Sequence, residues 1–301
     1  MNERMDNEPA HNNPVEELAA GSMSVVPVGL DDGYAYTKVA LLDGRLFCVP
    51  SRARMGASGV TWIRDQEQRI FEYETGGTVY SAGAVDGEPT QFDEYPGSAL
   101  NRVIVQHALQ NAGLSGRSIH LVTGLPVAAF YRNDGQRRLK AIDRKRDALK
   151  LTVEPLSNNR NTNKRPLKTS IAFHEVIPEA LAAWYDHVIV MQDDGVTLDA
   201  DRLNAPIAII DIGGRTTDYV VVQDQGIIHG SSGSLSSGML NVKTRVSDGI
   251  QAQFDLTELG EQRIAMAVDS HRLRVHGKDH DISALVAAAK RELVELLYAE
   301  T

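Results

Sequence analysis

The sequence predicts an α/β fold of two halves that share a cleft. Three observations predict it. The chain has 301 residues, of which 42% are hydrophobic and 24% charged, and apolar strand-like runs alternate with helical patterns. In addition, one strand–turn–strand pattern occurs twice along the chain. A disordered, collagen-like or disulfide-stapled chain is excluded by the same composition.

The net charge, the cysteine content and the apolar runs indicate the compartment and the partners of the protein. Asp and Glu number 40 against 31 Lys and Arg, a net charge of −9, so no direct contact with nucleic acid is expected. The single cysteine, Cys48, cannot form an internal disulfide. The sequence shows neither a secretory leader nor an apolar run of membrane length. These features predict a cytoplasmic protein without a membrane partner.

The N-terminal part is predicted to begin with a tail and continue as strands. Residues 1–24 contain four Asn, two Pro and five acids with almost no apolar periodicity, which is typical of disorder. Residues 25–50 read as three strands separated by Asp-Gly turns. The Gly-rich stretch that follows indicates a small inserted subdomain at about residues 45–97.

Helices and one further strand complete the predicted order. Ser98 is a helix cap before an apolar stripe that ends at Gly113, and SIHLVTGLP is a buried strand. Pro178 suits the first turn of a short helix, and Glu179 suits the positive end of the helix dipole there. The chain closes with an amphipathic helix over residues 283–298.

The repeated pattern carries the predicted chemistry. VGLDDGYAYTKVALL aligns without a gap with AIIDIGGRTTDYVVV, which pairs Asp31 with Asp211 and Gly33 with Gly213 at a separation of 180 residues. One such hairpin alone would indicate only a tight turn. Two copies that face each other bring two carboxylates and two sets of turn amides to one cleft. That arrangement suits a nucleotide phosphate with a hydrated Mg²⁺.

The same residues resemble a known family. LDDGYAYTK resembles the first phosphate motif of the actin-like ATPases, and IIDIGGRTTD resembles the second in the form used by the plasmid-segregation ParM/StbA family. VTGLP and VIPEALAAWY lie between these two motifs, in the order and spacing that the family uses. The resemblance implies an actin-like (duplicated ribonuclease-H-like) two-domain fold with mixed sheets flanked by helices and a nucleotide cleft between the domains. Domain I would span residues 25–180 and domain II residues 181–301, without the family's C-terminal adenosine-binding strand and helix.

The resemblance also implies site residues. Asp31 and Asp211 would hold Mg²⁺ through water and act in catalysis together with Glu179, which would position or activate the attacking water. Tyr34 replaces a small hydroxyl residue of the family, which predicts slower hydrolysis or altered nucleotide discrimination. ATP is the expected nucleotide, with GTP left open. The implied nucleotide-binding residues are Asp32, Gly33, Tyr34, Lys38, Gly213, Gly214, Arg215, Thr216 and Gly238.

The implied function is that of a filament-forming ATPase. Such a protein polymerises with itself into a helical filament, hydrolyses ATP, and moves plasmid DNA through a DNA-binding adaptor at a centromere-like site. Two alternatives stay open: a small-molecule kinase of the same superfamily fold, and a non-enzymatic regulator or filament cap that has lost its adenosine site.

Two polar regions allow more than one interpretation. Residues 137–168 carry eleven Lys or Arg against three acids, and their alternatives are a solvated surface, a contact between filament subunits and a nucleic-acid patch. A solvated surface is the default expectation, and a contact between filament subunits is the preferred functional interpretation. His271, His276 and His280 have metal-ligand chemistry, but their spacing fits no compact ligand set, so a solvated loop is expected.

Overall fold

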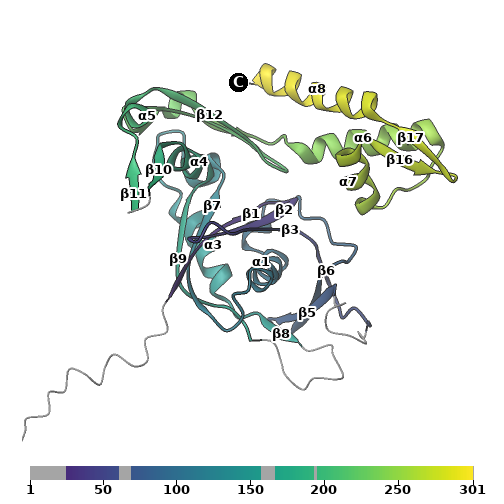
Figure 1. Ribbon diagram of the computed structural model, residues 1–301, viewed down its shortest axis with the longest axis horizontal. Helices are drawn as coiled ribbons and strands as arrows, with labels where there is room; N and C mark the ends of the chain where they lie inside the picture. Colours follow the sequence, from purple (N-terminus) through teal and green to yellow (C-terminus); the bar gives the residue numbers. More distant parts are fainter. Residues whose placement is uncertain (1–24, 61–68, 157–166, 193–194, 301) are drawn as a thin grey trace, which may run out of the picture.

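The computed structural model describes residues 25–60, 69–156, 167–192 and 195–300 (Figure 1). The predicted tail, residues 1–24, lies outside the described residues. Two groups of elements are apparent in Figure 1, one built on strands from the first half of the chain and one from the second.

Domain I is built on a five-stranded mixed sheet of order β3-β2-β1-β7-β9. The three N-terminal strands are antiparallel neighbours, and β7 and β9 continue the sheet in parallel with β1. Parallel neighbours need a crossover, and helices supply it here. The strands are β1 (Val26–Asp32), β2 (Tyr36–Leu41), β3 (Leu46–Pro50), β7 (Ser118–Leu125) and β9 (Ser170–Pro178).

A second sheet of order β4-β6-β5-β8 forms the inserted part. Its strands are β4 (Ala53–Met55), β5 (Ile70–Thr75), β6 (Thr78–Gly83) and β8 (Glu154–Leu156). The predicted start of the insertion at residue 45 is wrong, because the tight Asp43-Gly44 turn keeps β3 paired with β2. The stretch 137–168 also contributes β8, which pairs with β5.

The helix α1 (Ala99–Asn111) lies between these two sheets. Ser98 caps it as predicted, and its side chain accepts a hydrogen bond from the Asn101 amide at 3.1 Å. Every residue from Leu100 to Leu109 is buried, so the helix packs on more than the single face that its apolar stripe predicted. Val105 and Leu109 belong to the core of the first sheet, whereas other α1 residues pack with the inserted sheet.

Two helices lie between β7 and β9 along the chain, and a third helix, a hairpin and a short helix lead from β9 to the strands of the second domain. They are α2 (Val127–Phe130), α3 (Leu139–Lys150), α4 (Glu179–Val188), the hairpin of β10 (Ile189–Gln192) and β11 (Gly195–Leu198), and α5 (Ala200–Asn204). A buried cluster joins Val127 of α2, Trp184 of α4 and Val220 from the second half of the chain. This cluster packs the two domains together next to the repeated hairpins.

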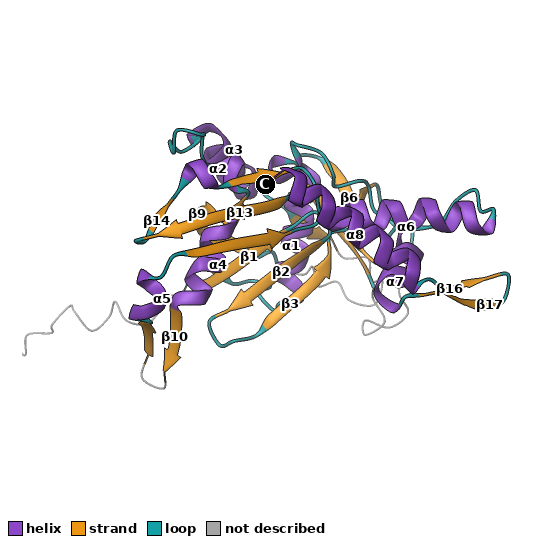
Figure 2. Cartoon of the chain, turned by 90° about the horizontal axis from the view of Figure 1, so that it is seen from above, coloured by secondary structure: helices purple, strands orange, loops and turns teal. Residues whose placement is uncertain are grey.

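Domain II contains the second copy of the hairpin and a helical group. The strands β12 (Ile207–Ile212), β13 (Thr217–Gln223), β14 (Gly226–Ile227) and β15 (Gly233–Leu235) form its sheet. The helices α6 (Met239–Phe254), α7 (Glu261–Ser270) and α8 (Ser283–Glu300) share one core with the hairpin of β16 (Arg272–Val275) and β17 (Lys278–Asp281). The predicted final helix is therefore confirmed, and α8 packs against α6, which also contacts α7 (Figure 2).

The described residues show neither a metal-binding cluster at the three C-terminal histidines nor a helix of membrane length. His271, His276 and His280 lie in or beside the β16–β17 hairpin, and the described residues contain no group of three or more acidic, Cys or His side chains placed to hold a metal. None of the helices in the described part of the chain is long and apolar enough to cross a lipid bilayer.

Candidate functional site at the two hairpin tips

The two repeated hairpins have the same register and meet at their tips. In the first hairpin Asp31 pairs with Lys38, and in the second Asp211 pairs with Asp218, so the separation of 180 residues holds in the structure. We call residues 33–35 the first tip and residues 213–216 the second tip. A side-chain carbon on Gly214 would lie 3.2 Å from the backbone nitrogen of Ala35, which shows that the tips are in contact.

Asp31 and Asp211 form the acidic part of this site. The Asp31 carboxylate accepts a hydrogen bond from Lys38 Nζ at 2.9 Å. Burial, together with the negative charge of Asp31, raises the pKa of Asp211, and Lys38 acts against this effect. Two carboxylates that repel each other and are rich in hard oxygen atoms suit a divalent cation such as Mg²⁺. The residues present therefore fit the predicted metal.

Glu179 is the most perturbed carboxyl group of the site. It begins α4 directly after β9, and Gly124 of the neighbouring strand β7 makes room for it. A side-chain carbon on Gly124 would lie 2.4 Å from the Glu179 Cγ. Burial raises the pKa of Glu179 to about 8, against the opposing charge of Lys145 and with a further rise from Asp218 and Asp31. A carboxyl group with this pKa suits proton transfer near neutral pH.

Lys145 is a part of the site that the sequence analysis did not single out. Its ammonium group donates to Asp32 Oδ1 at 2.7 Å and to the backbone oxygen of Gly124. The side chains of Lys145 and Asp32 are only 3% and 2% exposed. The signal was present in the helical spacing, because Lys145 lies on the same face of α3 as Ile142 and Leu149. A solvated role for this lysine is therefore wrong.

The same ion pair changes the role of Asp32. Its second carboxylate oxygen, Oδ2, accepts a hydrogen bond from Asn101 Nδ2 of α1 at 2.9 Å. Both oxygens are thus bound inside domain I, to α3 and to α1. The prediction that the Asp32 side chain binds the nucleotide is not supported, because this side chain anchors the end of β1 instead.

Asp218 connects the second hairpin with domain I. Its Oδ2 accepts a hydrogen bond from the backbone nitrogen of Val127 at 2.8 Å, while its buried Oδ1 has no hydrogen-bond partner. Next to it, the Ala128 nitrogen donates to Ser234 Oγ at 3.0 Å. Burial raises the pKa of Asp218 to about 6, the nearby Ser234 hydroxyl and the hydrogen bond from the Val127 nitrogen lower it, and the charge of Asp211 adds to the rise.

Replacing Asp218 with Asn should stabilise the unliganded protein above pH 6. The folded state binds a proton at Asp218 more tightly than the unfolded state does, so the ionised carboxylate costs stability at pH 7 to 8 and the cost disappears below about pH 4. Asn keeps an acceptor for the Val127 nitrogen. We expect a gain of up to about 3 kcal/mol at pH 8 and almost none at pH 4, measured by urea unfolding. Equal stability at pH 8 would contradict this account.

Tyr34 and Arg215 fill the space where the tips meet. The Arg215 guanidinium lies 5.5 Å from the centre of the Tyr34 ring and donates to Asp93 Oδ1 at 2.5 Å. Burial raises the pKa of the Tyr34 hydroxyl, Arg215 lowers it and the charge of Glu179 raises it further. The charges of Arg215 and Glu179 thus act on the pKa of this hydroxyl in opposite directions. Its ring also packs against Tyr95 at a centroid distance of 5.2 Å.

Gly238 and the start of α6 hold the second tip in place. The Met239 amide donates to the Gly213 oxygen at 2.9 Å. The Leu240 amide donates to the Gly214 oxygen at 2.8 Å. A side-chain carbon at Gly238 would lie 2.6 Å from both of these oxygens, so only glycine fits. Gly238 was implied to bind the nucleotide, but the amides that follow it already donate to carbonyl oxygens of the second tip, so they do not support that role.

The remaining predicted contacts lie at the tips themselves. The Gly213 nitrogen donates to the Thr216 oxygen at 2.9 Å and closes the second tip. Gly33 has the corresponding place in the first tip, and its backbone oxygen accepts a hydrogen bond from Ser51 Oγ at 2.6 Å. The Lys38 side chain is 63% exposed, and it is the cation of the first hairpin that pairs with Asp31.

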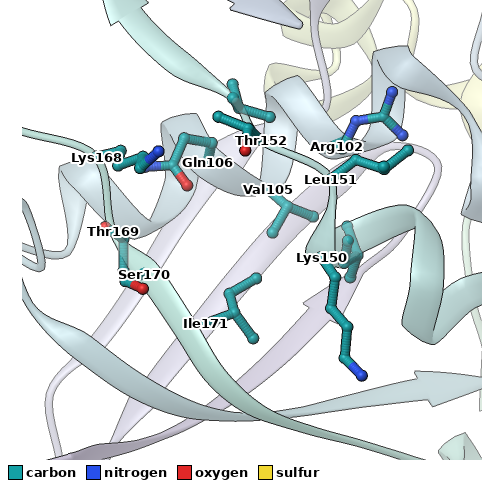
Figure 3. A pocket seen from close by; sticks show the side chains of 12 residues that line it. Arg102, Val105, Gln106, Lys150, Leu151, Thr152, Lys168, Thr169, Ser170 and Ile171 are labelled. Carbon is teal, nitrogen blue, oxygen red and sulfur yellow. The ribbon is translucent and has the colours of Figure 1, made fainter. Parts of the chain in front are cut away.

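A separate cavity of about 150 Å³ lies between α1, the end of α3 and the start of β9 (Figure 3). It is lined by cations and apolar side chains, among them Arg102, Lys150 and Lys168. The Arg102 guanidinium donates to the Ala148 oxygen near the C-terminus of α3 at 3.2 Å, and to Thr75 Oγ1 at 3.1 Å. The negative end of the helix dipole thus accounts for this buried charge. The cavity shares no lining residue with the hairpin tips.

Comparisons with known proteins agree with this geometry. Residues 28–188 match the model of the N-terminal region of the plasmid segregation protein ParM. Residues 209–300 match the C-terminal region of an MreB-like archaeal actin homologue. No curated protein sequence matches closely enough to count as a relative.

Solved structures show the actin-like fold. An archaeal actin homologue in complex with ADP has a TM-score of 0.66 at 20% identity, covering 92% of this chain and 81% of that one. A 15-stranded ParM filament from Clostridium botulinum has a TM-score of 0.65 at 18% identity, covering 92% and 83%. The actin-like protein Alp7A has a TM-score of 0.67 at 14% identity, covering 91% and 78%. The predicted two-domain actin-like fold is confirmed.

Proposed function

The chain belongs to the ParM family of plasmid segregation proteins, and we propose that it is an ATPase that forms filaments with ATP bound and hydrolyses the ATP to move plasmid DNA. The observation that carries the proposal is the contact between two hairpins of equal register, each of which brings an aspartate to the same place. Two proteins with a similar fold support the proposal. One is a ParM protein whose structure is a filament, and the other is an archaeal actin homologue in complex with ADP.

The residues of the site have separate roles in this proposal. Asp31 and Asp211 would hold Mg²⁺ through water, and Mg²⁺ would neutralise charge on the phosphates. Lys38 hydrogen-bonds Asp31 and would add a positive charge for a phosphate oxygen. Glu179, with its pKa of about 8, would orient the attacking water and accept its proton. The backbone amides of both tips would contact the phosphates.

Hydrolysis would be coupled to assembly through the contacts between the domains. Asp218 and Ser234 of domain II accept hydrogen bonds from Val127 and Ala128 of domain I. Loss of the terminal phosphate removes contacts to both tips, so the domains relax and a subunit interface that depends on their angle weakens. A coupling of about 1 to 3 kcal/mol would change subunit affinity roughly 5- to 150-fold.

The partners in the proposal follow the family. The chain would bind copies of itself in a helical filament, and a DNA-binding adaptor would connect the filament with a plasmid site in the cytoplasm. The helix α3 would contribute to contacts between subunits, since Lys140, Arg144 and Lys150 are exposed there. We expect no membrane partner and no direct contact with nucleic acid. ATP is the expected nucleotide, with GTP as the alternative.

Light scattering with ATP, ADP or no nucleotide tests the proposal. Wild-type protein should scatter strongly with ATP and Mg²⁺ and little without nucleotide, and Asp211→Ala should lose or alter the response. Asp248→Ala, at an exposed position of α6, is the matched control and should behave as wild type. If wild type does not respond to any nucleotide and ATP turnover requires a small-molecule acceptor, the protein is a kinase of this fold instead.

A further inference from the structure

The contact between Arg215 and Asp93 joins the second tip to the inserted part of domain I. The guanidinium Nη2 and Asp93 Oδ1 are 2.5 Å apart. The two residues are 122 positions apart in the sequence, and each lies on a turn, Arg215 on the second tip and Asp93 just before Tyr95. The ion pair therefore bridges the two domains at the place where the two hairpin tips meet.

The arginine of this pair also lies over an aromatic ring of the first tip. Its guanidinium lies 5.5 Å from the centre of the Tyr34 ring, and this ring belongs to the residue that replaces the family's small hydroxyl. Gly214, the neighbour of Arg215 in the second tip, contacts Ala35 of the first tip. Arg215 thus lies where the two tips meet, which is where the phosphates would bind if the proposed function holds.

The two partners differ in exposure. The Asp93 side chain is 84% exposed, whereas the Arg215 side chain is 25% exposed. An ion pair with one partner in water contributes little to stability, so Asp93 can be exchanged at low cost. A phosphate group offers the guanidinium a stronger, two-pronged set of hydrogen bonds. The arginine therefore has a weak partner in the unliganded protein and meets a better one in a bound triphosphate.

We propose that Arg215 is a phosphate-binding residue that Asp93 holds in reserve, and that ATP binding requires the guanidinium to leave Asp93 for the terminal phosphate. The inference rests on the proposed function and goes beyond it, because it names the competition that sets nucleotide affinity. Asp93 acts as an internal competitor. The exchange favours a triphosphate over a diphosphate, because the terminal phosphate is the new partner of the guanidinium in this proposal.

Nucleotide binding by the full chain tests the exchange. Affinities for fluorescent ATP and ADP analogues with Mg²⁺ are compared in wild type, Asp93→Asn, Arg215→Gln and the double variant. Asp93→Asn should bind ATP about 2- to 5-fold more tightly, which is the size of an exposed ion pair, with a smaller change for ADP. Arg215→Gln should weaken ATP binding about 10- to 100-fold, as the loss of a charged hydrogen bond does. The double variant should bind like Arg215→Gln.

The control separates this exchange from a general effect of charge. Asp86→Asn removes another exposed carboxylate from the same inserted part, and it should leave ATP affinity unchanged. Urea unfolding of the unliganded variants checks that each one folds. An Asp93→Asn variant that binds ATP like wild type, or an Asp93 effect that persists without Arg215, overturns the exchange alone. Absence of nucleotide binding in every folded variant overturns the proposed function and the exchange together.

Discussion

Replacing Lys145 with Met should lower the free energy of unfolding by about 3 to 5 kcal/mol. The ammonium group is the only cation within ion-pair distance of the buried Asp32 carboxylate among the described residues, and the carboxylate cannot reach water when the cation is lost. A buried charge without its partner is the costly case, far beyond the loss of one hydrogen bond. Urea unfolding at pH 7 measures the effect.

Two further variants make this result specific. Lys140→Met changes an exposed lysine of the same helix and should shift stability by less than about 0.5 kcal/mol. The double variant Lys145→Met with Asp32→Asn should recover a substantial part of the loss, because no unpaired charge remains in the interior. A Lys145→Met protein as stable as Lys140→Met would show that the pair is not buried as described.

Local sequence patterns predicted the hairpins and the helix ends, but they did not predict the burial of Lys145. Both hairpins were predictable, because an apolar run, Asp, a Gly turn and a second apolar run specify a hairpin and its register within about fifteen residues. The cap Ser98 and the final helix are equally local. The burial of Lys145 depends on a partner more than a hundred positions away, and only its place on the apolar face of α3 indicated it.

Other contacts carried no local signal at all. β8 pairs with β5 across some eighty residues of intervening chain, and its three residues lie in a stretch dominated by positive charge. Arg215 and Asp93 belong to different domains, and neither has neighbours that would predict the other. Gly238 was implied to bind the nucleotide, but the amides that follow it donate to carbonyl oxygens of the second tip. Tertiary contacts decided each of these cases.

Glu179→Gln should reduce ATP hydrolysis by about 10²- to 10⁴-fold, the usual contribution of a general base, and leave nucleotide affinity within a few fold. The amide keeps the shape of the carboxyl group beside Gly124 but cannot accept the proton of the attacking water. Turnover and binding are measured on the same preparation, with Glu74→Gln on the exposed side of β5 as a control that should keep wild-type turnover. Loss of nucleotide binding in parallel with turnover would show that Glu179 holds the site together and does not act as a base.

The pH dependence of the wild-type rate provides a second test of the same role. The pKa of Glu179 is raised to about 8 by burial, so at pH 7 most of the unliganded protein carries the neutral acid, which cannot accept a proton. The hydrolysis rate divided by the Michaelis constant should therefore rise up to tenfold per pH unit below the pKa and level off above it. Bound Mg²⁺ favours the ionised carboxylate and moves the midpoint of the maximal rate below 8. The Glu179→Gln variant should lose this rise, because the group that titrates is gone, and a rise that persists in the variant would assign the proton acceptor to another residue.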